Sequence, residues 1–248
     1  LGERAALSAG VAAGRHPGAA DDECRAENRE QPVQLDPIAI LPMPDQVTED
    51  SPTESTWRKR HERIRQTRQP HTSGLALGEC FVASVRMRAP HEAEKDLRVL
   101  QRSGSADPRW VQFYHSSVRE GGHPDRSYYF PVSGLFLRGF TDTLVQDWRG
   151  YIDLFACLLP GWEEQRIDFH GFHARGGVVV SGTWNRGGFT ITLRPRGASS
   201  TRVRISQPSA ITAGGQALGP ETFGGNETVE LTFKSRGPIT LTGHKRSA

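Results

Sequence analysis

The sequence predicts an α+β fold, with helices in the first part of the chain and an antiparallel β-sandwich in the last part. Apolar residues recur at helical spacing in several segments before residue 150, and they alternate with polar or small residues after residue 175. The composition changes at the same place, because residues 175–248 hold ten Lys and Arg but three Asp and Glu. Together, the two changes indicate two structural regions.

The composition argues against several classes of protein. Of the 248 residues, 35% are hydrophobic and 24% are charged, which is enough to build a core. No run of about 18 apolar residues is present, so neither a transmembrane helix nor a membrane partner is expected. The net charge of +3 is too small to indicate a nucleic-acid partner. Three widely separated cysteines fit neither a disulfide framework nor a CxxC metal site, and no cofactor motif is present.

Localisation is left open by the sequence. The apolar stretch at residues 5–13 is interrupted by Ser8 and Gly10, which makes it a poor match to a signal peptide. The cysteine content is compatible with either redox environment. The abundance of Arg, Ala and Gly is typical of proteins from GC-rich bacterial genomes.

Four segments have the features of helices: residues 51–66, 75–87, 91–102 and 132–148. Ser51-Pro52 with Glu54 forms a capping box at the start of the first segment. The last segment is apolar on more than half of its circumference, because apolar residues recur every fourth position at Val132, Phe136, Phe140, Leu144 and Trp148. A helix of this kind is expected to be buried between other elements.

The last part of the chain has the pattern of short strands. Val178, Val180 and Trp184 alternate with polar or small residues, and the segment 185–188 (Asn-Arg-Gly-Gly) is typical of a hairpin turn. Five or more such strands predict an antiparallel sandwich. The predicted organisation is an irregular lead-in over 1–33, a helical part over 34–150, an extended connector over 151–174 and a sandwich over 175–248.

Glu79 and Asp125 are the candidate catalytic carboxylates. Glu79 lies within an apolar helical segment. A carboxyl group in apolar surroundings has a raised pKa, which suits a general acid. The alternative for Glu79 is a position on the exposed face of its helix.

His115, Tyr128 and Tyr129 are candidate sugar-binding residues, because the stretch 114–130 is dense in aromatic and hydrogen-bonding side chains. Sugar sites combine aromatic platforms with a few placed polar groups, and loops carried by a rigid element often hold such sites. The alternative is packing of this stretch over a core.

Two other patterns have both a functional and a structural interpretation. Arginines alternate along two predicted strands, either as a polyanion-binding stripe or as a charged outer face that prevents edge pairing, at Arg194, Arg196, Arg202 and Arg204. His170 and His173 are three residues apart, but no carboxylate or cysteine pattern accompanies them, so no metal site is expected.

Four strings occur in a characteristic order and spacing: LDPIAILP at 35–42, GLALGE at 74–79, the segment 129–150 ending in LVQDWRG, and the segment 152–181 ending in FHGFHARGGVVVS. Together they resemble the C-terminal part of (α/α)6-toroid glycoside hydrolases, nearest to the α-L-fucosidase-type family 95. The resemblance covers roughly residues 34–195. It implies a fold in which the last helices of a toroid are followed by an antiparallel β-sandwich.

The resemblance also implies a function, the cleavage of glycosidic bonds by a carboxylic acid and a base-activated water. A toroid has twelve helices, so a chain with four predicted helices resembles the end of a longer enzyme. In family 95 the general acid and the water-activating asparagines precede the matching part. The late catalytic Asp of the family lies in a segment that matches residues 123–134, where Pro131 takes its place and Asp125 is nearby.

The chain alone is therefore expected to lack a complete catalytic site and to be inactive. Its expected partners are a carbohydrate and the missing N-terminal part of the toroid. It is expected to be secreted or periplasmic if the parent enzyme is exported. Two alternatives stay open. One is a non-catalytic carbohydrate-binding or structural module, and the other is a truncated remnant with exposed apolar surface.

Overall fold

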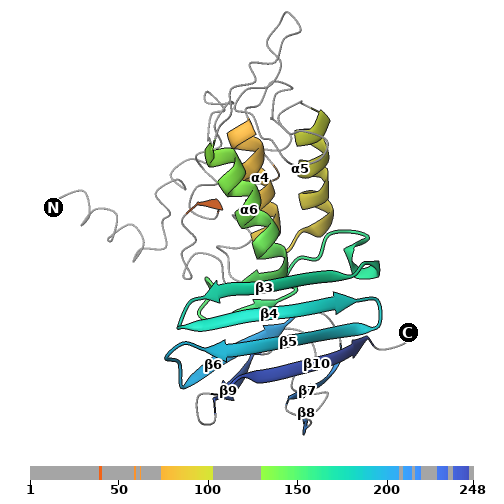
Figure 1. The fold of residues 1–248 in the computed structure, drawn as a ribbon. Coiled ribbons are helices and arrows are strands. Elements are labelled where there is room, and N and C mark those ends of the chain that lie inside the picture. Colours follow the sequence, from red (N-terminus) through yellow and green to blue (C-terminus); the bar gives the residue numbers. More distant parts are fainter. Residues whose placement is uncertain are drawn as a thin grey trace, which may run out of the picture.

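The structure, a computed structural model, describes residues 39–40, 59, 62, 74–102, 130–206, 209–213, 216–218, 228–233 and 237–245. In Figure 1 the labelled helices stand above two β-sheets. The predicted α+β class is therefore confirmed. The predicted lead-in over 1–33 and the predicted helix over 51–66 lie outside the described residues, apart from Lys59 and Glu62.

Helix α4 (Gly74–Arg86) is the centre of the helical part and packs between α5 (Pro90–Arg102) and α6 (Phe130–Leu144). Twelve of its thirteen residues are buried. Its many small residues allow both neighbours to approach closely. A Cβ atom on Gly139 of α6 would lie 2.3 Å from Cε1 of Phe81, so only glycine fits at this contact.

Helix α5 is amphipathic, as its charged sequence predicts, and it buries Ala93, Asp96, Leu97 and Leu100. The buried carboxylate of Asp96 accepts a hydrogen bond of 2.6 Å from Ser84 Oγ on α4. This bond satisfies two polar groups that would otherwise be costly to bury. Both predicted helices, 75–87 and 91–102, are thus present, with no end moved by more than one residue.

The prediction for α6 was wrong in two respects. The helix ends at Leu144 rather than Trp148, because the chain returns and the backbone N–H of Phe155 donates to the carbonyl of Leu144 at 2.6 Å. The next two residues form strand β1 (Val145–Gln146) instead of another helical turn. In addition, α6 is not buried all round, since Phe130 is 90% exposed and Leu137 is 71% exposed. The helix buried on all sides is α4.

The β part consists of two sheets, as predicted for a sandwich. The larger sheet has the order β3-β4-β5-β10-β7-β8, and all its pairs are antiparallel. Its strands are β3 (Ile167–Ala174), β4 (Val178–Asn185), β5 (Gly188–Pro195), β7 (Ser209–Ala213), β8 (Gln216–Leu218) and β10 (Ile239–Lys245). The predicted hairpin turn is present between β4 and β5, where Asn185 Oδ1 accepts from the N–H of Gly187 at 2.8 Å.

The smaller sheet has the order β1-β2-β6-β9, with strands β2 (Ile152–Leu154), β6 (Ser200–Ile205) and β9 (Val229–Thr232). Strands β2 and β6 pair in parallel, which is a departure from the predicted antiparallel arrangement. The reason is topological, because β3, β4 and β5 lie between them in the chain and return it to the same end of the sheet.

The sheets begin earlier in the chain than the change of composition suggests. The predicted boundary at Arg175 falls in the turn between β3 and β4, and these strands pair from Ile167 opposite Trp184 to Ala174 opposite Val178. The predicted connector over 151–174 holds β2, the short 3-10 helix η3 (Trp162–Glu164) and β3. The first described strand therefore starts at Val145, well before the change of composition.

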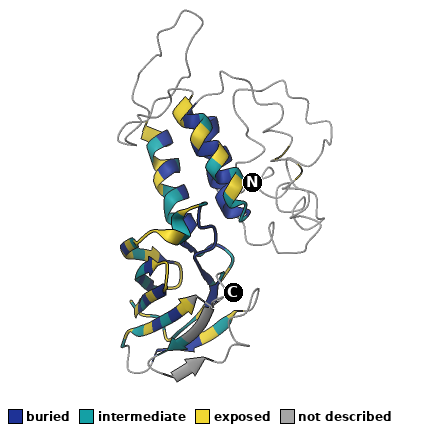
Figure 2. Cartoon of the chain, turned by 90° about the vertical axis from the view of Figure 1, so that its right-hand side faces the viewer, coloured by how far each residue is buried: buried dark blue, intermediate teal, exposed yellow. Residues whose placement is uncertain are grey.

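The core between the sheets is rich in aromatic rings. The ring of Phe155 lies 4.9 Å from that of Trp184, 5.3 Å from Phe189 and 6.3 Å from Phe169, measured between centroids. Leu144, the last residue of α6, belongs to this same core. Figure 2, coloured by burial, shows dark blue running from the helices into the sheets. Among the described helices none is both long and apolar enough to cross a membrane.

Candidate functional site

The structure describes one of the five residues predicted to form a site. Glu79 lies in the middle of α4 and is 4% exposed, so it is in the interior rather than on an exposed helix face. Asp125, His115, Tyr128 and Tyr129 lie outside the described residues. Whether the five side chains meet therefore stays a prediction.

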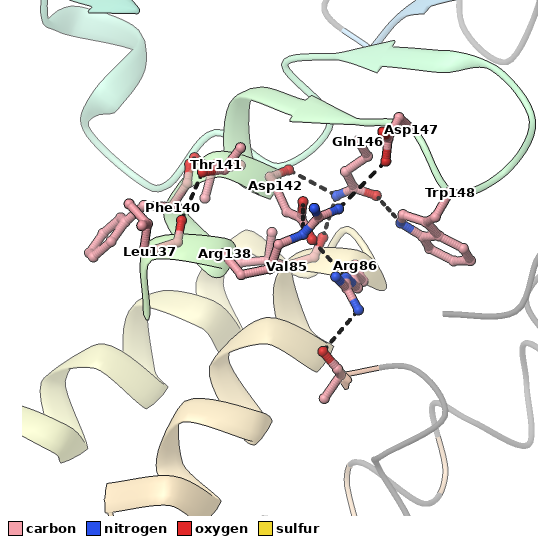
Figure 3. A network of polar contacts seen from close by, with 12 residues as sticks. Val85, Arg86, Leu137, Arg138, Phe140, Thr141, Asp142, Gln146, Asp147 and Trp148 are labelled. Atoms are coloured by element: carbon pink, nitrogen blue, oxygen red, sulfur yellow. Dashed lines mark hydrogen bonds and ion pairs between the residues drawn. The ribbon is translucent and has the colours of Figure 1, made fainter. Parts of the chain in front are cut away.

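A buried network of polar side chains joins the helices to the sheets (Figure 3). Arg86 Nε on α4 donates to Asp142 Oδ2 on α6 at 2.6 Å, and neither side chain is more than 2% exposed. A second guanidinium, that of Arg138, lies 2.8 Å from the other oxygen of Asp142. Arg86 also donates from Nη1 to the carbonyl of Ala39 at 2.9 Å. The carboxylate is thus held between two cations.

Burial and charge act in opposite directions on this pair. Burial raises the pKa of the Asp142 carboxyl, while Arg86 and Arg138 act to lower it. Burial likewise lowers the pKa of Arg86, and Asp142 opposes that shift. Each charge makes the burial of the other tolerable, which is how buried ion pairs persist in protein interiors.

The residues after α6 satisfy the free carbonyl groups at the end of α4. Gln146 Nε2 donates to the carbonyls of Val85 and Asp142, both at 3.0 Å, and its Oε1 accepts from Trp148 Nε1 at 3.2 Å. Arg149 donates to the carbonyl of Arg86 at 2.8 Å, and its guanidinium lies 4.3 Å from the centre of the Trp148 ring. The last carbonyls of a helix need such partners, so this network has a clear structural role.

A second carboxylate, Asp153 on β2, has a similar role. It forms an ion pair with Arg88, which follows α4, and it accepts a hydrogen bond of 2.7 Å from Ser206 Oγ. Asp142 and Asp153 are therefore both buried beside arginines. Because both side chains are at most 1% exposed, neither is placed to contact a sugar.

Two clefts lie beside the network of polar side chains that joins the helices to the sheets. One, of about 560 Å³, contains two carboxylates, Asp147 and Glu230. Both are engaged, because Asp147 accepts from the backbone N–H of Arg175 at 2.8 Å and Glu230 accepts from Ser200 Oγ at 2.9 Å. The other, of about 400 Å³, is lined by three arginines and by apolar residues: Arg86, Arg138, Arg175, Ala39, Ile40, Leu75, Pro131 and Leu135.

A third cleft, which we call the aromatic groove, combines apolar and aromatic side chains with polar ones. It has a volume of about 640 Å³ and lies between α5, the end of α6 and η3. One part is apolar, with Leu97, Phe140, Leu159, Pro160 and Trp162, and the other is the polar face of α5, with Glu94, Arg98, Gln101 and Arg102. No sequence signal distinguishes this groove, because its polar residues follow the pattern of an ordinary solvent-exposed helix face.

The other sequence patterns show no site. Within the described ranges, no group of three or more His, Cys, Asp or Glu is placed to hold a metal ion, and His170 and His173 are exposed on β3. The four arginines do not form one stripe. Arg194 is exposed on β5 in the larger sheet, whereas Arg204 is 4% exposed on β6 in the smaller one.

The described cysteines are expected to be unreactive in the folded protein. Burial raises the pKa of the Cys157 thiol to about 12, and Cys80 is fully buried. Because the thiolate is the reactive form, a Cys24→Ser variant should show no fast reaction with Ellman's reagent at pH 8 and two equivalents after unfolding. A fast equivalent in the folded variant would contradict the buried placement of these thiols.

Comparisons with known proteins place the chain in no family. No protein-family model and no curated protein matches it. Among solved structures, it is similar to Ara127N-Se, a GH127 β-L-arabinofuranosidase from Geobacillus stearothermophilus T6, with 11% sequence identity and a TM-score of 0.36. The match covers 69% of this chain and 31% of that protein, so it spans less than a third of the other protein's length.

Proposed function

We propose that this chain is the C-terminal part of an (α/α)6-toroid glycoside hydrolase of the α-L-fucosidase-like type. The observation that carries the proposal is the arrangement around α4. A helix buried on all sides lies between two others, and a β-sandwich follows directly, which is the order that the sequence resemblance implies. The exposed Phe130 and Leu137 on α6 are the kind of apolar surface that a further helix would cover.

The reaction would be hydrolysis of a glycosidic bond by a carboxylic acid and an activated water. Among the described residues, Asp142 and Asp153 form buried ion pairs with arginines, and the side chain of Glu79 on α4 is buried. We therefore assign the described part a supporting role, in which it completes the helical layer and anchors the sandwich. The acid and the groups that position water would belong to preceding helices.

The test compares this chain with the longer product of its own reading frame. The purified chain is expected not to hydrolyse 4-nitrophenyl α-L-fucoside or 4-nitrophenyl β-L-arabinofuranoside. The longer polypeptide, translated from the reading frame upstream of Leu1, is expected to hydrolyse one of these two substrates. A stop codon directly upstream, or a longer product with no glycosidase activity, would overturn the hydrolase proposal.

A Glu79→Gln variant controls for activity within the chain itself. If the purified chain hydrolysed an aryl glycoside and this variant did not, Glu79 would be the acid and the supporting role would be refuted.

A second candidate function, carbohydrate binding without catalysis, is favoured by the aromatic groove.

A further inference from the structure

We propose that the aromatic groove binds a pyranose ring of a neutral carbohydrate. The inference goes beyond the proposed hydrolase function, because the ligand class is argued from the groove alone. Its volume of about 640 Å³ falls within the range of roughly 300–1,000 Å³ that small-molecule sites occupy. The residues that line it come from α5, α6 and the segment 159–162.

The floor of the groove suits the apolar face of a sugar ring. Phe140 and Trp162 are partly buried and stack on each other, with planes parallel to within 7° and centroids 6.0 Å apart. Leu97 and Leu159 are buried beside them. A pyranose ring has a face of C–H groups and a rim of hydroxyls, so it matches a surface in which an aromatic pair adjoins polar side chains.

The aromatic pair is held in place by its surroundings. Trp162 packs against both the helical core and the core between the sheets. Its backbone N–H donates to the carbonyl of Leu159 at 2.9 Å, in a turn where Gly161 has φ +82°. A platform fixed before binding does not lose side-chain freedom when a ligand arrives, which favours binding of a small ligand.

The rim offers the donors and acceptors that hydroxyl groups require. Glu94, Arg98 and Gln101 lie on one face of α5, because residues three and four apart in a helix are neighbours. Glu94 Oε1 accepts from Arg98 Nη2 at 2.7 Å, so a carboxylate and a guanidinium lie side by side. Since a hydroxyl both donates and accepts, two adjacent hydroxyls of a sugar can bind such a pair together.

The test follows the indole N–H signal of Trp162 by NMR while 2′-fucosyllactose, lactose or maltotriose is added to the full chain. A Trp162→Phe variant identifies the signal. For at least one of these sugars the signal should move in a saturable way, with a dissociation constant of about millimolar, typical of a single small ligand. The Arg98→Ala variant should bind about tenfold more weakly, because it removes a charged hydrogen-bond donor.

Arg98 is an exposed helix residue, so its replacement should not affect folding, which circular dichroism will check. The matched control is Arg194→Ala on the exposed face of β5, which should bind as the unmodified chain does. The proposal is overturned if no sugar moves the Trp162 signal, if Arg98→Ala binds unchanged, or if the signal depends on protein concentration alone, which would show self-association at the groove.

The two proposals fail separately. Sugar binding at Trp162 in a protein whose longer form has no glycosidase activity would refute the hydrolase function and leave the groove intact. Glycosidase activity in the longer form without any response of Trp162 would refute the groove alone.

Discussion

Replacing Asp142 with Ala is expected to lower the free energy of unfolding by about 3–5 kcal/mol, because it leaves a buried guanidinium without its counter-ion. Arg86 is 2% exposed, and its Nε donates to Asp142 at 2.6 Å. Arg138 would lose its contact with the same carboxylate. Urea unfolding of the variant and the unmodified chain, followed by circular dichroism, measures the difference.

Two further variants separate the charge from the packing. The double variant Arg86→Met with Asp142→Leu removes both buried charges, so it should be more stable than Asp142→Ala. Lys95→Ala breaks the exposed pair with Glu92 and should change stability by less than about 0.5 kcal/mol. If Asp142→Ala were as stable as Lys95→Ala, the stability of the protein would not depend on the ion pair between Arg86 and Asp142.

Replacing Phe155 with Ala is also expected to cost about 3–5 kcal/mol, through the loss of buried area and the cavity left behind. Its ring is fully buried and contacts Phe169, Trp184 and Phe189 at the centre of the sandwich. The backbone of Phe155 has φ +56°, and Ala would keep that strain. The change in the urea midpoint therefore reports on side-chain packing.

The control for Phe155 is Leu137→Ala on α6. Leu137 is a large apolar residue that is 71% exposed, so its removal should change stability by about 0.5 kcal/mol or less. Equal losses for Phe155→Ala and Leu137→Ala would show that the aromatic cluster is not the centre of the sandwich core.

Local sequence signals predicted the elements whose boundaries depend on local chemistry. Pro90 separates the two predicted helices and is the first residue of α5, and the turn at 185–188 (Asn-Arg-Gly-Gly) joins β4 to β5 as predicted. The end of α6 could not be predicted, because Val145 and Trp148 continue its apolar period. The helix stops at Leu144 owing to pairing with β2, a contact between separate segments that a pattern within one segment does not reveal.

The candidate groove and the buried network could not be predicted for a related reason. Arg86 and Asp142 are 56 positions apart in the sequence, where each has the position of an ordinary polar residue near the end of a helix. The two halves of the aromatic groove likewise come from α5 and from the segment around Trp162. Residue type indicated an aromatic sugar platform, but in the stretch 114–130, of which residues 114–129 lie outside the described part of the chain.

The continuity of α6 with β1 has a consequence for the inheritance of this fold. No loop separates Leu144 from Val145, and Leu144 already belongs to the core between the sheets. A gene exchange that transferred the sandwich without the end of α6 would leave a cavity in the core between the sheets. The last helix and the sandwich are therefore expected to pass between genes as one unit, together with α4, whose Arg86 is paired with Asp142 of α6.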